Sequence, residues 1–292
     1  MSSSTLTPMM QQYMETKEQY KDCILFYRLG DFYEMFFDDA LTVTKELDIT
    51  LTGKNCGLEE RAPMCGVPYH AVEGYLTRLV QKGYKVAICE QVEDPKLAKG
   101  IVKREVVRIV TPGTNINTQA LDETKNNYIM CIVYIADRYG LSVADVSTGD
   151  YFVTELDSGR KLLDEIAKFS PSEIICNESL YMSGLDLEDL KNRLGITIYS
   201  LDAWYFDDGM CTKVLKDHFK VSSLEGLGLT DYNCGLIAAG ALLQYLYETQ
   251  KTSLAHLTGI ISYTTGKYML LDSSSRRNLE LCETLREKQK RG

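Results

Sequence analysis

YIMCIVYIADRYGLSVADVSTGDYFVTEL, residues 128–156, divides into three apolar runs separated by two short polar turns. The runs cover residues 128–136, 140–147 and 151–156, and turn-forming residues stand between them at 137–140 and 148–150. Short apolar runs joined by tight turns are typical of consecutive antiparallel strands. The stretch therefore predicts a three-stranded meander.

Helices and strands are expected to alternate after this meander. The pattern predicts a helix over about 160–169, a strand over 173–176, a helix near 185–194, a strand over 196–200 and a long helix starting at about residue 230. A meander followed by such alternation favours a layered α/β fold of the ribonuclease-H-like kind. The analogy concerns the fold and does not by itself indicate a function.

The residues before the meander predict another α/β unit, built on a mixed sheet. Thr7 and Pro8 mark the start of a helix that runs to about Tyr20, and a second helix is expected over 32–47. Apolar runs predict strands at 23–27, 49–52, 85–91 and 105–110. An amphipathic helix closed by Gly83 is expected at 70–82, after a polar loop over 53–62 and an irregular stretch over 63–68.

Four segments follow from these patterns. We expect a first domain over residues 1–113, a linker over 114–127, a second domain over 128–266 and a further segment over 267–292. The last segment starts a helix at about Asp272, and its leucines at 279, 281 and 285 have little chain left to pack on. We therefore expect the chain to be a truncated piece of a longer protein.

The composition is that of a globular protein, with 292 residues, 45% hydrophobic and 25% charged, and a formal net charge of −9. The acidity argues against phosphate binding in general. Residues 78–110, however, carry eight Lys and Arg against four Asp and Glu, a basic strip that permits contact with nucleic acid. No apolar run approaches the roughly 20 residues of a membrane span. Since a secretory signal is also absent, we expect a cytoplasmic protein.

The cysteines and histidines do not predict a metal site. Nine cysteines form no Cys-x-x-Cys pair, and most lie in apolar runs, which predicts free buried thiols. Cys65 and His70 are close in sequence, but only three histidines exist and no second ligand pair has metal spacing.

Gly30-Asp31-Phe32-Tyr33-Glu34 is expected where a strand gives way to a helix, and two interpretations of it are open. Asp31 and Glu34 have the Asp-x-x-Glu spacing of a capping box, in which Glu34 would reach back to a backbone N–H and Phe32 would be a core residue. Alternatively, Phe32 and Glu34 belong to a binding site.

Several blocks of sequence, in order and at characteristic spacing, resemble the MutS family of bacterial DNA mismatch-recognition proteins. They are Tyr27–Phe36, Ala62–Ala71, Val86–Gln91, Val106–Gly113 and Leu271–Leu281. The resemblance is dense over residues 7–113 and 268–281 and weaker through 128–250. It identifies the first domain as the mismatch-recognition domain, the second as the connector domain and the last segment as the truncated start of the core and lever region.

The resemblance implies that this chain recognises mismatches in double-stranded DNA. In the family, an aromatic-x-Glu motif reads the mismatch, and it maps onto Phe32, which would wedge into the minor groove and stack on a mispaired base, and onto Glu34, which would hydrogen-bond to that base. An unpaired or mispaired base has already lost part of its stacking, so the wedge costs less there. Candidate contacts to the DNA backbone or groove are Lys54, Arg61, His70, Arg78, Lys103, Arg104 and Arg108.

The resemblance also implies partners and missing parts. The connector would relay the DNA-bound state and dock the MutL partner. The chain holds no GxxxxGK[ST] phosphate loop, so we expect ATP and Mg²⁺ to bind only the ATPase domain outside this chain, and no cofactor here. We expect no enzymatic activity, weak DNA binding and a monomer, although the full-length family members are dimers.

Two other classes of function stay open. Both units could dock repair partners, with the motif around Phe32 serving only as a helix cap. The second unit could instead be a metal-dependent nuclease that uses Asp145 and Asp150, although such a site needs several converging carboxylates.

Overall fold

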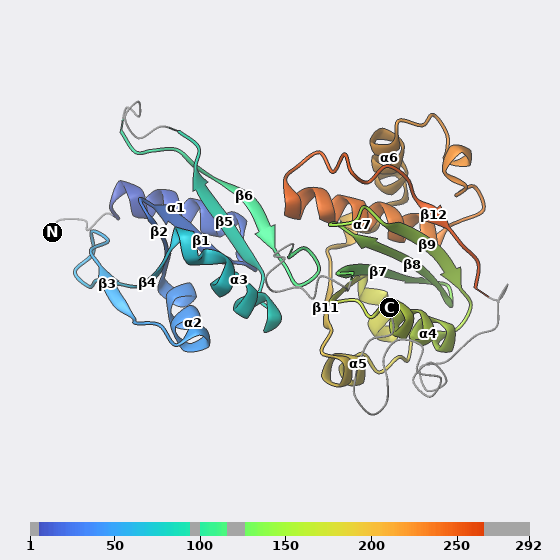
Figure 1. Ribbon diagram of the computed structural model, residues 1–292, viewed down its shortest axis with the longest axis horizontal. Helices are drawn as coiled ribbons and strands as arrows, with labels where there is room; N and C mark the ends of the chain where they lie inside the picture. Colours follow the sequence, from blue (N-terminus) through green and yellow to red (C-terminus); the bar gives the residue numbers. More distant parts are fainter. Residues whose placement is uncertain (1–5, 94–99, 116–125, 266–292) are drawn as a thin grey trace. The chain divides into compact units, whose positions relative to one another are not determined.

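The computed structural model describes residues 6–93, 100–115 and 126–265 and divides the chain into two compact α/β units. Unit 1 comprises Met1–Lys125 and Leu246–Leu254, and unit 2 comprises Asn126–Tyr245 and Ala255–Gly292 (Figure 1). The predicted C-terminal helix and most of the predicted linker lie outside the described residues.

Unit 1 is built on a six-stranded mixed sheet in the order β3-β4-β2-β1-β5-β6. β1 and β5 are parallel, and every other neighbouring pair is antiparallel. Its strands are β1 (Ile24–Leu29), β2 (Phe32–Phe36), β3 (Thr52–Lys54), β4 (Ala62–Pro68), β5 (Val86–Gln91) and β6 (Arg104–Val110). Its helices are α1 (Pro8–Gln19), α2 (Phe37–Leu47), the 3-10 helix η1 (Tyr69–Ala71) and α3 (Val72–Gln81).

Two cores cover the two faces of this sheet. Tyr33 and Met35 of β2 pack in a core with residues of α2 and α3, such as Val43 and Leu79. Phe36 packs in the other core, with residues of α1 such as Tyr13. Because side chains alternate along a strand, Phe32 and Glu34 belong to the same face as Phe36. The face that carries the motif is therefore the face covered by α1.

The expected helix over residues 32–47 is wrong in its first five residues. Phe32–Phe36 is the strand β2, which pairs with β1 through Leu29 and Phe32 and leaves Gly30 and Asp31 as a two-residue turn. Gly30 has a φ of +61°, which fits the first central position of a type II′ hairpin turn. Since Glu34 lies in a strand, the capping-box interpretation of Asp31 and Glu34 is also wrong.

The other expectations for unit 1 are mixed. The helices α1 and α3 and the strands β1, β5 and β6 confirm the predictions, and Gly83 ends α3 with a φ of +87°. The stretch 63–68, expected to be irregular, belongs to strand β4. The strand expected at 49–52 instead forms three residues later, as β3.

Unit 2 has the sheet order β11-β10-β7-β8-β9-β12. Its first three strands, β7 (Tyr128–Ile135), β8 (Arg138–Asp145) and β9 (Tyr151–Leu156), form the predicted antiparallel meander. β10 (Glu173–Cys176) is parallel to β7, and β11 (Thr197–Ser200) is parallel to β10. This arrangement, with the fourth strand beside the first, confirms the ribonuclease-H-like expectation.

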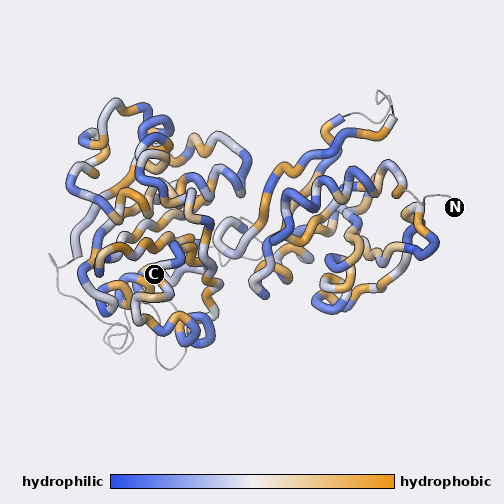
Figure 2. The backbone as a smooth tube through the Cα atoms, turned by 180° about the vertical axis from the view of Figure 1, so that it is seen from behind, coloured by the Kyte–Doolittle hydropathy of each residue, from blue (hydrophilic) through white to orange (hydrophobic). Residues whose placement is uncertain are grey.

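Helices surround the sheet of unit 2. They are α4 (Gly159–Phe169), the 3-10 helices η2 (Glu178–Met182), η3 (Ala203–Phe206) and η4 (Leu224–Leu227), α5 (Leu187–Leu194), α6 (Asp208–Phe219) and α7 (Cys234–Gln250), whose residues 246–250 are assigned to unit 1. The sequence did not predict α6 or the short strand β12 (Ile261–Ser262), and α7 starts four residues later than expected. Figure 2 shows hydrophobic segments along the strands and hydrophilic segments in many of the outer turns.

Glycines let α7 approach its neighbours closely. A Cβ at residue 140 would lie 2.0 Å from the carbonyl oxygen of Cys234, and a Cβ at residue 240 would lie 2.3 Å from Cβ of Cys211. Such distances exclude any side chain at these two positions. The N-terminus of α7 is further held by Glu155, whose Oε1 accepts hydrogen bonds from the backbone N–H of Gly235 at 2.9 Å and of Asn233 at 2.5 Å.

The eight cysteines within the described residues are free and buried, which confirms the sequence expectation. Burial raises the pKa of Cys23, Cys65 and Cys89 to about 12, so these thiols stay protonated and unreactive at neutral pH. Among the described helices, none is both long enough and apolar enough to cross a membrane.

Candidate nucleic-acid interface

The ring of Phe32 stands at the end of the β1–β2 hairpin and is 47% exposed. Its strand neighbours are Leu29 on β1 and Pro68 on β4. Large aromatic side chains usually bury most of their surface, since burial is their main contribution to stability. Phe36, on the same face of the same strand, is only 1% exposed. The interpretation of Phe32 as a core residue is therefore wrong.

Glu34 lies two residues along the strand from Phe32 and is paired with Lys54 of β3. The Nζ of Lys54 is 2.5 Å from Oε2 of Glu34 and lies 5.6 Å from the centre of the Phe36 ring. Both side chains are partly exposed, by 17% for Glu34 and 32% for Lys54. The structure thus joins two predicted site residues that are 20 positions apart in the chain.

Gly66 of β4 is paired with Glu34 and leaves space beside both residues of the motif. A Cβ on Gly66 would lie 3.6 Å from Cγ of Glu34 and 3.8 Å from Cδ1 of Phe32. Lys54 is paired with Ala62 of the same strand, so its long side chain reaches Glu34 diagonally across β4.

Arg28 and Tyr69 support the hairpin, and the sequence analysis assigned neither of them a role. The guanidinium of Arg28 stacks on the Tyr69 ring at 4.0 Å, and its Nε donates to the carbonyl oxygen of Gly30 at 2.5 Å. The backbone N–H of Tyr69 donates to the carbonyl oxygen of Asp31 at 2.9 Å. Both carbonyls of the turn are thus bound by neighbouring groups, which holds the turn below Phe32 in one conformation.

A second set of contacts fixes the stem of the hairpin. Arg28 is also paired with Glu90 of β5 at 3.7 Å, and Glu90 accepts a hydrogen bond from the Tyr33 hydroxyl. Burial and the neighbouring Glu90 carboxylate raise the pKa of Tyr33, so the hydroxyl stays a proton donor. Tyr33 points away from Phe32, into the core on the other face.

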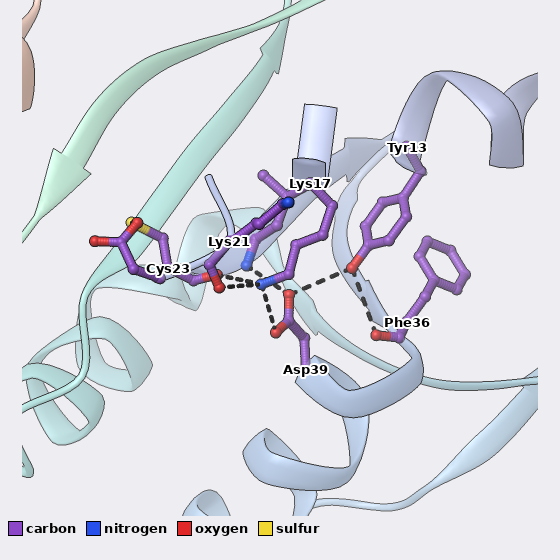
Figure 3. Close-up of polar contacts among 8 residues, drawn as sticks. Tyr13, Lys17, Lys21, Cys23, Phe36 and Asp39 are labelled. Carbon is purple, nitrogen blue, oxygen red and sulfur yellow. Dashed lines mark hydrogen bonds and ion pairs between the residues drawn. The ribbon is translucent and has the colours of Figure 1, made fainter. Parts of the chain in front are cut away.

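The far end of β2 is anchored by Asp39 in the first turn of α2 (Figure 3). Its carboxylate accepts hydrogen bonds from the Leu25 backbone N–H at 2.9 Å and from the Tyr13 hydroxyl at 3.4 Å, and it pairs with Lys17 at 3.0 Å. These contacts join α1 and β1 to the corner between β2 and α2. The strand that carries Phe32 and Glu34 is therefore fixed at both ends.

The other predicted DNA contacts differ in whether their side chains are exposed or are already bonded within the protein. Arg61 and His70 are exposed, and His70 follows Tyr69 directly. Lys103 pairs with Glu105 at 2.5 Å, and Arg108 with Glu73 of α3 at 3.5 Å. Arg78 donates to the carbonyl of Leu47 at 3.2 Å, on the side of α2 and α3.

Arg104 is the predicted contact most involved in the fold. Its guanidinium donates to the carbonyl of Arg28 at 2.7 Å, to the Gln12 amide oxygen at 3.0 Å and to the carbonyl of Val102 at 2.9 Å. It also lies 5.2 Å from the centre of the Tyr27 ring. We conclude from these contacts that Arg104 holds β1 and α1 against β6.

In unit 2, the acidic residues considered for a nuclease site hold the turn between β8 and β9. The buried carboxylate of Asp145 accepts hydrogen bonds from the backbone N–H groups of Asn127 at 2.9 Å and Ser147 at 2.8 Å, and from the Ser147 hydroxyl at 2.5 Å. Asp150 accepts from the amide of Asn126 at 3.0 Å. Within the described residues, no three His, Cys, Asp or Glu side chains gather as metal ligands would.

Comparison with known protein families covers both units. Residues 7–119 match the family model of MutS domain I, and residues 127–258 match that of MutS domain II. The chain belongs to the MutS family. The first match lies in unit 1, and the second covers residues of unit 2 together with residues 246–254 of unit 1. Phe32 and Glu34 lie in the part that matches domain I.

Curated MutS relatives align with nearly the whole chain. The DNA mismatch repair protein MutS of Lachnoclostridium phytofermentans is 70% identical over 287 residues, which cover 98% of this chain and 31% of the relative. The protein of the same name from Ruminiclostridium cellulolyticum is 55% identical, over 99% of this chain and 33% of the relative. The chain thus spans about a third of the length of these relatives.

Proposed function

We propose that this chain acts in DNA mismatch repair by recognising mispaired or unpaired bases, with the Phe32 ring as the wedge. The observation that carries the proposal is the half-exposed ring on a hairpin whose turn and stem are both held by hydrogen bonds. The relatives that align with the chain are named DNA mismatch repair proteins, which supports the same role.

The physical basis is the cost of separating stacked bases. Inserting an apolar ring into a base step costs roughly a few kcal/mol, because stacking is lost and the duplex is kinked. A mispaired or unpaired base has weaker stacking and pairing, so the same insertion costs less there. A wedge on a rigid hairpin adds little ordering cost of its own. Phe32 would thus distinguish mismatched from fully paired DNA by how easily the duplex is deformed.

Glu34 would supply a second way of distinguishing mismatched from fully paired DNA. A carboxylate near phosphates is repelled, which weakens binding to fully paired duplex. At a mismatch, the hydrogen-bonding groups of the disturbed base are exposed, and Glu34 could bond to one of them. Lys54, Arg61 and His70, which lie on β3, next to β4 and in η1, would contact the DNA backbone near the wedge.

The two domains would divide the work. We propose that residues 1–113 form the mismatch-recognition domain and residues 128–266 the connector, which relays the DNA-bound state and docks a MutL-type partner. The domain that hydrolyses ATP is not among the two domains matched here, and we propose no catalytic step for these residues.

Equilibrium binding tests the wedge. The dissociation constants of the intact protein and of its Phe32→Ala variant would be measured on a duplex with one unpaired thymine and on its fully paired counterpart. We expect the substitution to remove the preference for the unpaired base. A variant that kept the preference would contradict the role of Phe32 as the wedge. An intact protein without any preference for the unpaired base would leave docking of repair partners as the function of this surface.

A further inference from the structure

The ion pair between Lys54 and Glu34 occupies the carboxylate that the proposed function assigns to a base. The Nζ of Lys54 lies 2.5 Å from Oε2 of Glu34, and both side chains are partly exposed at the edge of the motif. A carboxylate in such a pair must leave its lysine, or share it, before it can bond to anything else. We infer that Lys54 competes with the mispaired base for Glu34 and so sets how strongly the protein discriminates mismatched from paired DNA.

This inference rests on the proposed function, and it follows from charge. On a fully paired duplex, Glu34 finds no free base group, so its pair with Lys54 stays closed. The lysine then neutralises most of the repulsion between Glu34 and the phosphates. On a mismatch, Glu34 moves to the base, and Lys54 turns to a phosphate. The pair therefore makes paired DNA easier to bind and makes the mismatch contact harder to form.

The surroundings allow the exchange. Gly66, which is paired with Glu34, has no side chain on this face, so β4 places no side chain directly beside the Glu34 carboxylate at that position. Lys54 is on β3, the edge strand of the sheet. Its side chain is 32% exposed, and its ammonium has a second favourable contact with the Phe36 ring at 5.6 Å. The two side chains are held by one ion pair, and partly exposed pairs of this kind are weak enough to open on binding.

Removing Lys54 should have an effect that would not be seen if Lys54 only contacted a phosphate. In Lys54→Met, Glu34 keeps its charge without a neutralising partner, so paired duplex is repelled more strongly. The mismatch contact no longer has an ion pair to break. Affinity for both duplexes falls, but the ratio of the two dissociation constants rises by about three- to tenfold. If Lys54 were only a phosphate contact, both affinities would fall equally and the ratio would not change.

The experiment measures both dissociation constants for the intact protein and for Lys54→Met, Lys54→Arg and Lys45→Met, on duplexes with and without one unpaired thymine. Lys54→Arg keeps a cation for Glu34 and should keep the ratio within about twofold. Lys45 is exposed on α2, away from the motif, and its removal controls for the loss of one positive charge. Unfolding midpoints confirm that each variant folds.

A double variant isolates the contribution of the Lys54–Glu34 ion pair to the ratio of the two dissociation constants. In a Glu34→Gln background, Lys54→Met should leave the ratio unchanged, because no carboxylate remains to be neutralised. A ratio that does not rise in Lys54→Met, or that rises equally in the Glu34→Gln background, would overturn the inference. If Phe32→Ala removes mismatch preference while Lys54→Met leaves the ratio unchanged, only the role of Lys54 fails. If Phe32→Ala keeps the preference, the proposed function itself fails.

Discussion

The β1–β2 hairpin of unit 1 and the β8–β9 hairpin of unit 2 use their side chains in opposite ways. The first leaves an aromatic ring half exposed, and its carboxylate at Glu34 has a lysine as its partner. In the second, the Asp145 carboxylate is fully buried and accepts hydrogen bonds from the backbone N–H groups of Ser147, in the turn, and of Asn127, just before β7. A carboxylate bound by backbone serves the fold, whereas one bound by a mobile side chain can be released to a ligand.

The two phenylalanines of β2 should differ most in how much their substitution lowers the free energy of unfolding. Phe36→Ala should lower the free energy of unfolding by about 3–5 kcal/mol, because it empties a packed core position. Phe32→Ala should cost less than about 1 kcal/mol, because the ring is already 47% exposed. Urea unfolding of both variants measures this. Equal losses would mean that Phe32 is a core residue after all.

Asp145→Ala should destabilise unit 2 by about 3 kcal/mol, since it leaves the backbone N–H groups of Asn127 and Ser147 without their partner. Asp150→Ala is the matched control, because Asp150 bonds to an exposed amide, and its loss should cost no more than about 0.5 kcal/mol. Chemical unfolding monitored in unit 2 distinguishes the two. An Asp145→Ala variant as stable as the parent would show that the turn does not need its carboxylate.

Substitutions of Glu34 should change binding more than folding. Glu34→Ala should tighten binding to paired duplex and lower the preference for an unpaired base by about tenfold, or 1.4 kcal/mol. Glu34→Gln removes the charge but keeps an acceptor, so its loss of preference should be smaller. Competition binding with both duplexes measures the ratio. Unchanged discrimination in both variants would remove Glu34 from the mechanism.

Gly30→Ala should cost about 1 kcal/mol, because its φ of +61° is unfavourable for a residue with a side chain. Gly74→Ala, within α3, is a control of opposite sign: an added Cβ meets nothing within 4 Å, and alanine favours a helix. It should stabilise by about 0.5 kcal/mol. Thermal unfolding of the two variants checks the signs, and a tolerated Gly30→Ala would argue against a tight turn below Phe32.

Much of the fold could be predicted because periodicity is a local property. The meander of unit 2 and helix α3 have unambiguous apolar patterns. The prediction of a helix over Phe32–Phe36 is wrong, although Tyr33 and Met35 alternate with Phe32, Glu34 and Phe36 as a strand requires. Gly30-Asp31 between two apolar runs was the missed hairpin signal. The sequence does not predict the strand β4 because β4 contains two prolines, Pro63 and Pro68, which argue against a strand.

The candidate site could be predicted only in part. Resemblance directed attention to Phe32 and Glu34, but exposure and pairing are tertiary properties. The partner of Glu34 lies on another strand, and the sequence offers no signal that selects Lys54 over Arg61. Arg104 carries the same charge as the other candidates, yet it is engaged by three acceptors. Charge alone cannot distinguish an arginine or lysine that stabilises the fold from one whose charged group can bind DNA.

Disulfide trapping at residue 31, beside the intact Phe32 ring, tests the central claim most directly. Asp31→Cys places a thiol in the exposed turn of the hairpin and leaves Phe32 in place, while the eight described native thiols are buried and do not compete. A duplex with a thiol tether in the minor groove at an unpaired base would be incubated with Asp31→Cys, with a Lys45→Cys control and with the parent protein. The account predicts a crosslink for Asp31→Cys at the unpaired base and little at the same base when paired. Equal trapping at paired and unpaired positions, or none at either, would contradict it.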